Sequence, residues 1–157
     1  MGISTFLLFE RGKSAPAYDL LRSLNSICIK ENLFFDNDED CSSSEGTLKY
    51  SRAYISDRPF KEDYSRPLCF SVYDEPYEYQ IISFKWDDTN SEYFKAVVSD
   101  DFCDNEDLLL RFSHAILNIY PTAKIWIEED WFYTLEDLDK IVNMPYNNDW
   151  CYKNPKN

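Results

Sequence analysis

The sequence predicts an α+β fold, with a mostly antiparallel sheet of about five to six strands and helices packed on one of its faces. Two observations predict this fold class. Several short stretches alternate apolar and polar residues and are separated by turn residues, which is typical of antiparallel strands joined by short connections. Longer stretches repeat apolar residues at helical spacing. The expected order is β-α-β-β-β-β-α-β-α in a single domain, 1–157.

The chain is expected to begin with a buried strand and a helix. Ile3–Phe9 is an apolar run of a length that suits a buried strand. The helix is predicted at about Ala17–Glu31, with Ser14 as its cap. The segment that follows, Phe35–Gly46, is acidic and rich in small residues, so it is predicted to be an exposed loop.

Four strands joined by short turns are expected next, as an antiparallel meander. Their tyrosines, together with Trp126, are candidates for the sheet face that the helices do not cover, because an aromatic ring with a polar tip tolerates partial burial. The four predicted strands are Thr47–Ile55, 67–73, Tyr79–Trp86 and Tyr93–Ser99.

The last third is predicted to contain a helix, a strand and a second helix. Asp104 is expected to cap a helix near Asn105–Tyr120, because aspartate commonly accepts the first backbone N–H groups of a helix. A short strand follows at Ala123–Glu128, and Thr134 is expected to open a helix over Leu135–Val142. The remainder, 144–157, is rich in turn residues and is expected to be a loosely packed tail.

Charge and cysteine content limit the function classes. The chain carries 29 acidic and 16 basic side chains and a net charge of −13, which repels nucleic acid and anionic lipid and attracts basic proteins. The chain has 5 cysteines, an odd number, and no Cys-x-x-Cys pair. This indicates free thiols in a reducing compartment, so the cytoplasm is the expected location. No apolar run is long enough to span a bilayer.

The known motifs for metal or cofactor binding and for catalysis do not fit this sequence. The acidic run that starts at Asp36 resembles a calcium loop, but it has Cys41 and Thr47 where an EF-hand needs glycine and glutamate. His114 is the single histidine, and no third group orients it toward Cys103 as a nucleophile–base pair requires. We therefore expect no cofactor, no metal and no enzymatic activity.

Two groups of carboxylates, one of them beside aromatic residues, are the candidate partner-binding site. Acidic side chains select a basic partner, and exposed tryptophan and tyrosine commonly anchor interfaces. The first group precedes the predicted helix near 105–120, and the second follows the strand at 123–128. The candidate residues are Asp100, Asp101, Asp104, Glu128, Glu129, Asp130, Trp131 and Tyr133.

The segment Tyr120–Ile141, YPTAKIWIEEDWFYTLEDLDKI, together with the acidic and aromatic surface around it, resembles the small acidic immunity proteins of bacterial contact-dependent toxin systems. It covers about a seventh of the chain. The resemblance implies a cytoplasmic inhibitor that binds a toxin domain and blocks its active site or substrate entry. With this net charge, the expected partner is a basic toxin domain, with nuclease activity the leading expectation.

Three alternatives remain open on the sequence alone. A small carboxylate- or metal-dependent hydrolase would use Glu128, Glu129, Asp130 or His114. A subunit of a larger assembly would bind through the uncovered sheet face. A mimic of nucleic acid would present its carboxylates in place of phosphates, from the acid clusters at 36–40, 74–78, 87–88, 100–107 and 128–130.

Overall fold

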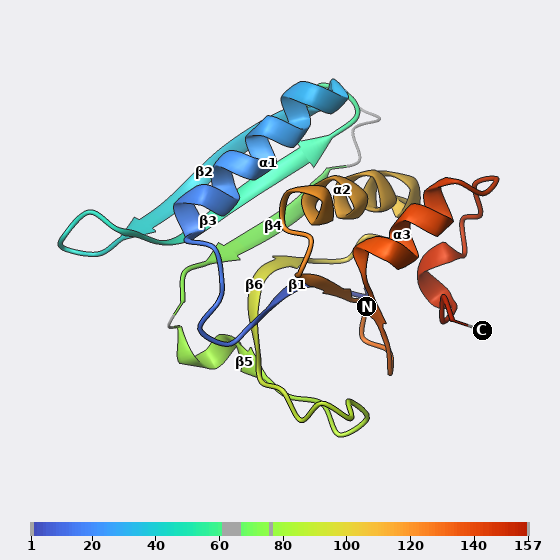
Figure 1. The fold of residues 1–157 in the computed structure, drawn as a ribbon. Helices are drawn as coiled ribbons and strands as arrows, with labels where there is room; N and C mark the ends of the chain where they lie inside the picture. The colour runs from blue at the N-terminus through green and yellow to red at the C-terminus, as the bar shows by residue number, and fades with distance from the viewer. Residues whose placement is uncertain (1, 61–66, 76, 157) are drawn as a thin grey trace.

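The computed structural model describes residues 2–60, 67–75 and 77–156, and it confirms the α+β class. Three helices pack against one antiparallel sheet of eight strands in this described part (Figure 1). The helices are α1 (Ala17–Glu31), α2 (Glu106–Ile119) and α3 (Leu135–Val142). The strands are β1 (Thr5–Glu10), β2 (Phe34–Ser42), β3 (Leu48–Ser56), β4 (Leu68–Tyr73), β5 (Ile81–Ile82), β6 (Tyr93–Ser99), β7 (Lys124–Trp126) and β8 (Phe132–Tyr133).

The strands lie in the order β2-β3-β4-β6-β1-β7-β8, with β5 paired to β6 off this path. The sheet has more strands than predicted, because β2 and β8 were not expected. The predicted strand at 79–86 shortens to Ile81–Ile82, and its partner is β6.

The prediction of an exposed loop at 35–46 was wrong over most of its length. β2 runs from Phe34 to Ser42 and pairs with β3 along its length, with irregularities at Asn37/Glu39 and Cys41/Ser42. Phe35 packs against the core, whereas the acidic residues of β2 are exposed at the end of the sheet. Pairing with β3 therefore makes this acidic segment a strand, although its composition is typical of a loop.

One face of the sheet is covered by α1 and α2, with α3 beside α2 (Figure 1). α1 packs on β2, β3 and β4, and Leu20, Leu24 and Ile27 are buried on its inner side. The predicted cap of this helix was wrong. Pro16 occupies the N-cap position, and Oδ1 of Asp74 accepts the Ala17 N–H at 2.8 Å from the end of β4.

The expected cap of α2 was also wrong, but that of α3 was confirmed. Asp104 adopts a left-handed backbone with φ of 68°, and Asn105 takes the N-cap position of α2. Thr134 caps α3 in a reciprocal capping box with Asp137, in which each side chain accepts a backbone N–H of the other residue.

The C-terminal segment is anchored rather than loosely packed throughout. Trp150 and Cys151 are buried in a short 3₁₀ turn, and the indole Nε1 of Trp150 donates to the carbonyl of Glu106 at 2.9 Å. Residues 142–149 are exposed, as expected of a tail. In the part of the chain that the structure describes, no helix combines the length and apolar character needed to cross a bilayer.

Candidate functional site: the open face of the sheet

The face of the sheet opposite the helices carries a row of neighbouring side chains, one from each of seven strands, that runs from β2 to β8. The strand registers align Arg52 of β3 with Ser71 of β4 and then with Val98 of β6. Val98 pairs with Phe6, which pairs with Trp126. The row ends at Phe132 on β8 and begins at Glu39 on β2. None of these side chains is buried, so together they form a continuous, partly exposed surface that we name the open face.

A row of tyrosines extends this surface toward one end of the sheet. Tyr50 and Tyr73 lie opposite each other on β3 and β4, with ring centroids 5.3 Å apart. Tyr73 contacts Tyr77 at 5.6 Å, and Tyr77 contacts Tyr79 at 5.8 Å. Tyr77 is 48% exposed and Tyr79 is 85% exposed. Large rings that remain this accessible are typical of protein-binding surfaces.

Arg52 lies between the tyrosines and the acidic strand. Its guanidinium lies 5.8 Å from the ring centroid of Tyr54, and its Nε donates to Sγ of Cys69 at 3.1 Å. Desolvation raises the pKa of Tyr54, and the nearby Cys69 and Asp38 add to that rise. Arg52, Tyr54 and Asp38 thus lie close to one another on this face.

The other end of the open face is a compact aromatic cluster. Phe84 reaches over the sheet to contact Trp126 at 4.7 Å and Phe132 at 5.4 Å between ring centroids. Trp86 contacts Phe132 at 4.7 Å. The segment 83–92 therefore covers part of β6, β7 and β8 on the face without helices.

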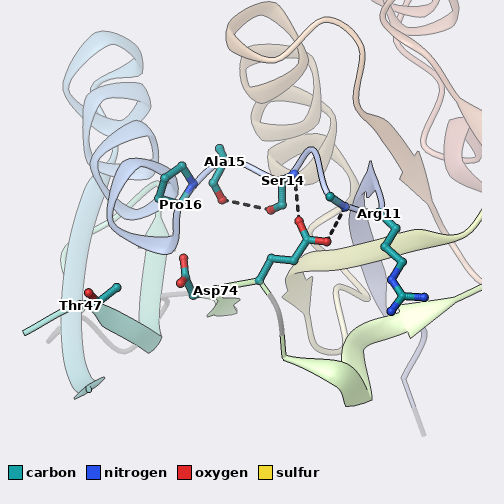
Figure 2. Close-up of a pocket in the computed structure, with 8 residues that line it drawn as sticks. Arg11, Ser14, Ala15, Pro16, Thr47 and Asp74 are labelled. Carbon is teal, nitrogen blue, oxygen red and sulfur yellow. Dashed lines mark hydrogen bonds between the residues drawn. The ribbon is translucent and has the colours of Figure 1, made fainter. Parts of the chain in front are cut away.

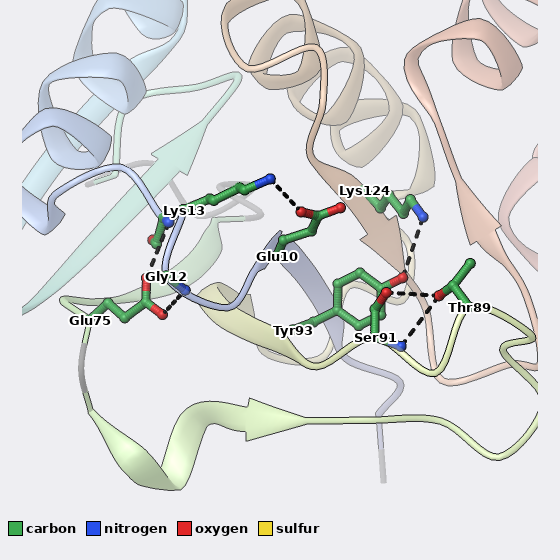
Figure 3. Close-up of polar contacts among 9 residues, drawn as sticks. Glu10, Gly12, Lys13, Glu75, Thr89, Ser91, Tyr93 and Lys124 are labelled. Carbon is green, nitrogen blue, oxygen red and sulfur yellow. Dashed lines mark hydrogen bonds and ion pairs between the residues drawn. The ribbon is translucent and has the colours of Figure 1, made fainter.

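Polar contacts hold this covering segment in place. Asp87 is buried and accepts hydrogen bonds from the Tyr93 hydroxyl at 2.9 Å and from the Thr89 hydroxyl at 2.9 Å. Burial raises the pKa of Asp87, but the hydrogen bonds from Thr89 and Tyr93 outweigh it and the net pKa is below its usual value. The Lys124 ammonium also reaches the Tyr93 hydroxyl, at 3.4 Å (Figure 3).

The sheet topology brings the two predicted carboxylate groups to one end of the sheet. β6 and β7 both run antiparallel to β1, so their C-terminal ends lie at the N-terminal end of β1. Asp100 and Asp101 follow β6, whereas Glu128 and Glu129 follow β7. Glu128 accepts the Ser4 N–H at 2.9 Å, so this carboxylate is attached to the start of the chain.

The predicted carboxylates are exposed and bind backbone groups near them. Asp101 accepts the Cys103 N–H at 3.0 Å, and its hydrogen bonds with the Cys103 side chain and backbone lower the pKa of Asp101. Asp104, Glu129 and Asp130 are exposed as well. The acids that follow β6 and β7 thus lie, exposed, at the end of the sheet where β1 begins.

Trp131 and Tyr133, the two aromatic residues predicted to contact a partner, differ in how far they are buried. Tyr133 is 0% exposed, and its hydroxyl donates to the carbonyls of Trp150 and Lys153. The prediction that Tyr133 contacts a partner was therefore wrong, because its ring and hydroxyl are used inside the fold. Trp131 is half-buried against the same core. Trp126, which lies within the predicted strand Ala123–Glu128, instead provides the indole on the open face.

His114 and the carboxylates at 128–130, which the hydrolase alternative would use, do not line a common hollow among those of the described residues. Nε2 of His114 lies 2.7 Å from Oδ1 of Asp139, which links α2 to α3. His114 lines a hollow of about 180 Å³ with Glu31 and Arg111, and none of the carboxylates at 128–130 lines it. Across the described ranges, no group of three or more ligating side chains is arranged to hold a metal ion.

A hollow of about 600 Å³ lies between the β1–α1 loop and the end of β4, and Arg11, Asp74 and Glu75 are among the residues that line it (Figure 2). Its backbone donors already have partners, because Glu75 accepts the Gly12 N–H at 2.6 Å and the Ser14 N–H at 3.1 Å. Glu75 therefore fastens the β1–α1 loop (Figures 2 and 3), and Asp74 accepts the Ala17 N–H at the start of α1. Pro76, in the same predicted acid cluster, lies outside the described residues.

The tyrosines and Trp126 were candidates for the uncovered face. The structure confirms this for Tyr50, Tyr54, Tyr73 and Trp126, whereas Tyr93 is only 2% exposed. Sequence reasoning missed Arg52, Phe6 and Phe84 as members of this surface. The alternation in β3 could have identified Arg52, since it lies two residues from both Tyr50 and Tyr54. No protein-family model, no curated protein and no solved structure matches this chain.

Proposed function

We propose that this protein is a noncatalytic, cytoplasmic binding protein that neutralises a basic toxin domain, as an immunity protein does. The observation that carries the proposal is the open face. It combines accessible tyrosines, an arginine and a tryptophan with carboxylates along two of its borders. Aromatic and arginine side chains are enriched among the residues that dominate binding energy.

Carboxylates at two borders of the open face, one along β2 and one at the end of the sheet where β1 begins, supply the charge that would select a basic partner. Asp36, Asp38 and Glu39 lie along β2 at one side of the open face, and the carboxylates at 100–101 and 128–130 lie at the β1 end. With a net charge of −13, these acids steer a basic domain toward the protein and raise its association rate. Nuclease activity is the leading expectation for the partner, because nucleases carry basic surfaces for their substrate.

The direct test is co-expression with the polypeptide encoded beside this chain. The proposal expects that polypeptide to be toxic alone and harmless together with this protein. A stable complex should form, and its association rate should fall as salt concentration rises. If the neighbouring polypeptide forms no complex and the protein protects no cell, the proposal is wrong.

A matched pair of variants connects the function to the open face. Tyr79→Ala removes a ring that is 85% exposed at the end of the tyrosine row, so the fold should be unaffected. Tyr18→Ala removes a ring that is 58% exposed on α1, on the covered side of the sheet. We expect Tyr79→Ala to weaken the complex by about 1–2 kcal/mol and Tyr18→Ala to leave it unchanged. Equal effects would exclude the open face as the binding surface.

A further inference from the structure

The outer edge of β2 is the longest exposed strand edge of the sheet. β2 spans nine residues at one end of the strand order, and no strand pairs with its outer side in the described part of the chain. β8, at the opposite end of the order, is two residues long. An exposed edge carries backbone N–H and C=O groups that can pair with another extended segment.

The side chains of β2 determine which kind of added strand could pair with its outer edge. Edge strands are commonly protected by charged side chains, proline, bulges or short length. β2 is nine residues long, has no lysine or proline, and carries two register irregularities and a run of carboxylates. Its four carboxylates, Asp36, Asp38, Glu39 and Asp40, would meet the same four carboxylates if a second copy paired along this edge. Like charges directly opposite each other destabilise a strand pair, whereas opposite charges stabilise it. The edge therefore disfavours self-association and favours a basic strand.

The side chains of β2 place negative charge on both sides of the edge. Asp36 lies beside Tyr54, and Glu39 lies opposite Arg52, both on the open face. Asp40 faces the helix side, where its carboxylate accepts a hydrogen bond from Ser51 and another from the Asn37 amide. An added strand would thus meet carboxylates on the open face and on the helix side, and its open-face side chains would also contact Tyr54.

We propose that β2 accepts an extended, lysine- or arginine-rich segment of the protein partner as an additional strand of the sheet. The inference rests on the proposed function, because it specifies how a basic partner engages the border of the open face. In the unbound chain, the Asn37 N–H is satisfied by Oδ1 of its neighbour Asp36 at 2.9 Å. A bound strand would offer backbone carbonyls to the N–H groups of this edge.

The test uses a seven-residue peptide that alternates lysine and valine, followed through the amide resonances of the isotopically labelled protein. We expect shifts at the amides of residues 34–42 and of their β3 neighbours. Two control peptides separate pairing from charge. One alternates glutamate and valine, and the other keeps the lysines but is N-methylated at every residue, so it has no backbone N–H to donate.

Two protein variants with the same change in charge locate the site. Asp36→Asn, Asp38→Asn and Glu39→Gln together neutralise the β2 edge. Asp19→Asn, Glu136→Gln and Asp149→Asn neutralise three exposed carboxylates of α1, α3 and the C-terminal segment, which lie outside the proposed binding surface. The first triple variant should weaken peptide binding about tenfold, and the second should not change it. Circular dichroism of both variants checks that the fold is kept.

The inference is overturned if the N-methylated peptide binds equally well, if the shifts fall at the β1 end of the sheet, or if no shift occurs. Its failure is distinct from failure of the proposed function. A complex with the neighbouring polypeptide that tolerates the β2 triple variant but not Tyr79→Ala would keep the function and remove β2 from the interface. Absence of any such complex would remove the function itself.

Discussion

Asp87 connects the turn at 87–90 to the aromatic cluster, and replacing it with asparagine tests how that cluster is held. The carboxylate is 9% exposed and accepts from the Thr89 hydroxyl, the Thr89 backbone N–H and the Tyr93 hydroxyl. Asparagine keeps the shape but loses the charge and one acceptor oxygen. Hydrogen bonds to a charged group contribute about 1.5–3 kcal/mol each, so we expect a loss of roughly 2 kcal/mol.

Urea denaturation followed by tryptophan fluorescence measures this loss, and thermal melting should show a decrease of about 4–8 °C. Asp88→Asn is the matched control, because Asp88 is exposed beside Asp87 and should change stability by less than about 0.5 kcal/mol. Equal losses from the two substitutions would refute the role given to the Asp87 hydrogen bonds.

The wild-type protein and the Asp87→Asn variant should differ in how their stability responds to acid. The folded state lowers the pKa of Asp87 below its usual value of 3.8. Its stabilising contribution is therefore complete above pH 3.8 and is lost as the pH falls below that value. The stability difference between wild type and Asp87→Asn should shrink over that acidic range.

Three further outcomes test other parts of the structure. Thr134→Ala removes one half of the α3 capping box and should lower the free energy of unfolding by about 1 kcal/mol in urea titrations. Trp150→Ala removes the buried anchor of the C-terminal segment and should cost about 3–5 kcal/mol, a large part of the stability of a domain this size. Burial raises the pKa of Cys28 to about 11 and that of Cys151 to about 12. At pH 8, mass spectrometry after alkylation should find exposed Cys41 modified and these two thiols unmodified, and stability should decline as the pH rises above the usual thiol value of 9.0.

The elements that the sequence predicts well are those whose pattern is local. α2 is an example, because Leu108, Phe112 and Ile116 recur at helical spacing and all three are buried. The capping box at Thr134 is likewise complete within four residues. The uncovered sheet face was also predictable, since alternation in a strand determines which side chains share a face.

The features that sequence reasoning missed depend on residues far apart in the chain. β2 is a strand because it pairs with β3, and its own acidic composition favours a loop. The N-terminus of α1 is capped by Asp74, 57 positions away from Ala17. Tyr133 follows a turn of exposed carboxylates, but the C-terminal segment returns to bury it. The row from Glu39 to Phe132 needs the strand order and registers, which no local pattern contains.

Hydroxyl-radical footprinting of the tyrosines tests the central claim most directly, once the protein is in complex with the polypeptide encoded beside it. Tyr77 and Tyr79 on the tyrosine row and Tyr18 on α1 are all exposed in the free protein and should be oxidised there. The account predicts that the complex protects Tyr77 and Tyr79 while Tyr18 stays reactive. Protection of Tyr18 with continued oxidation of the other two would contradict it.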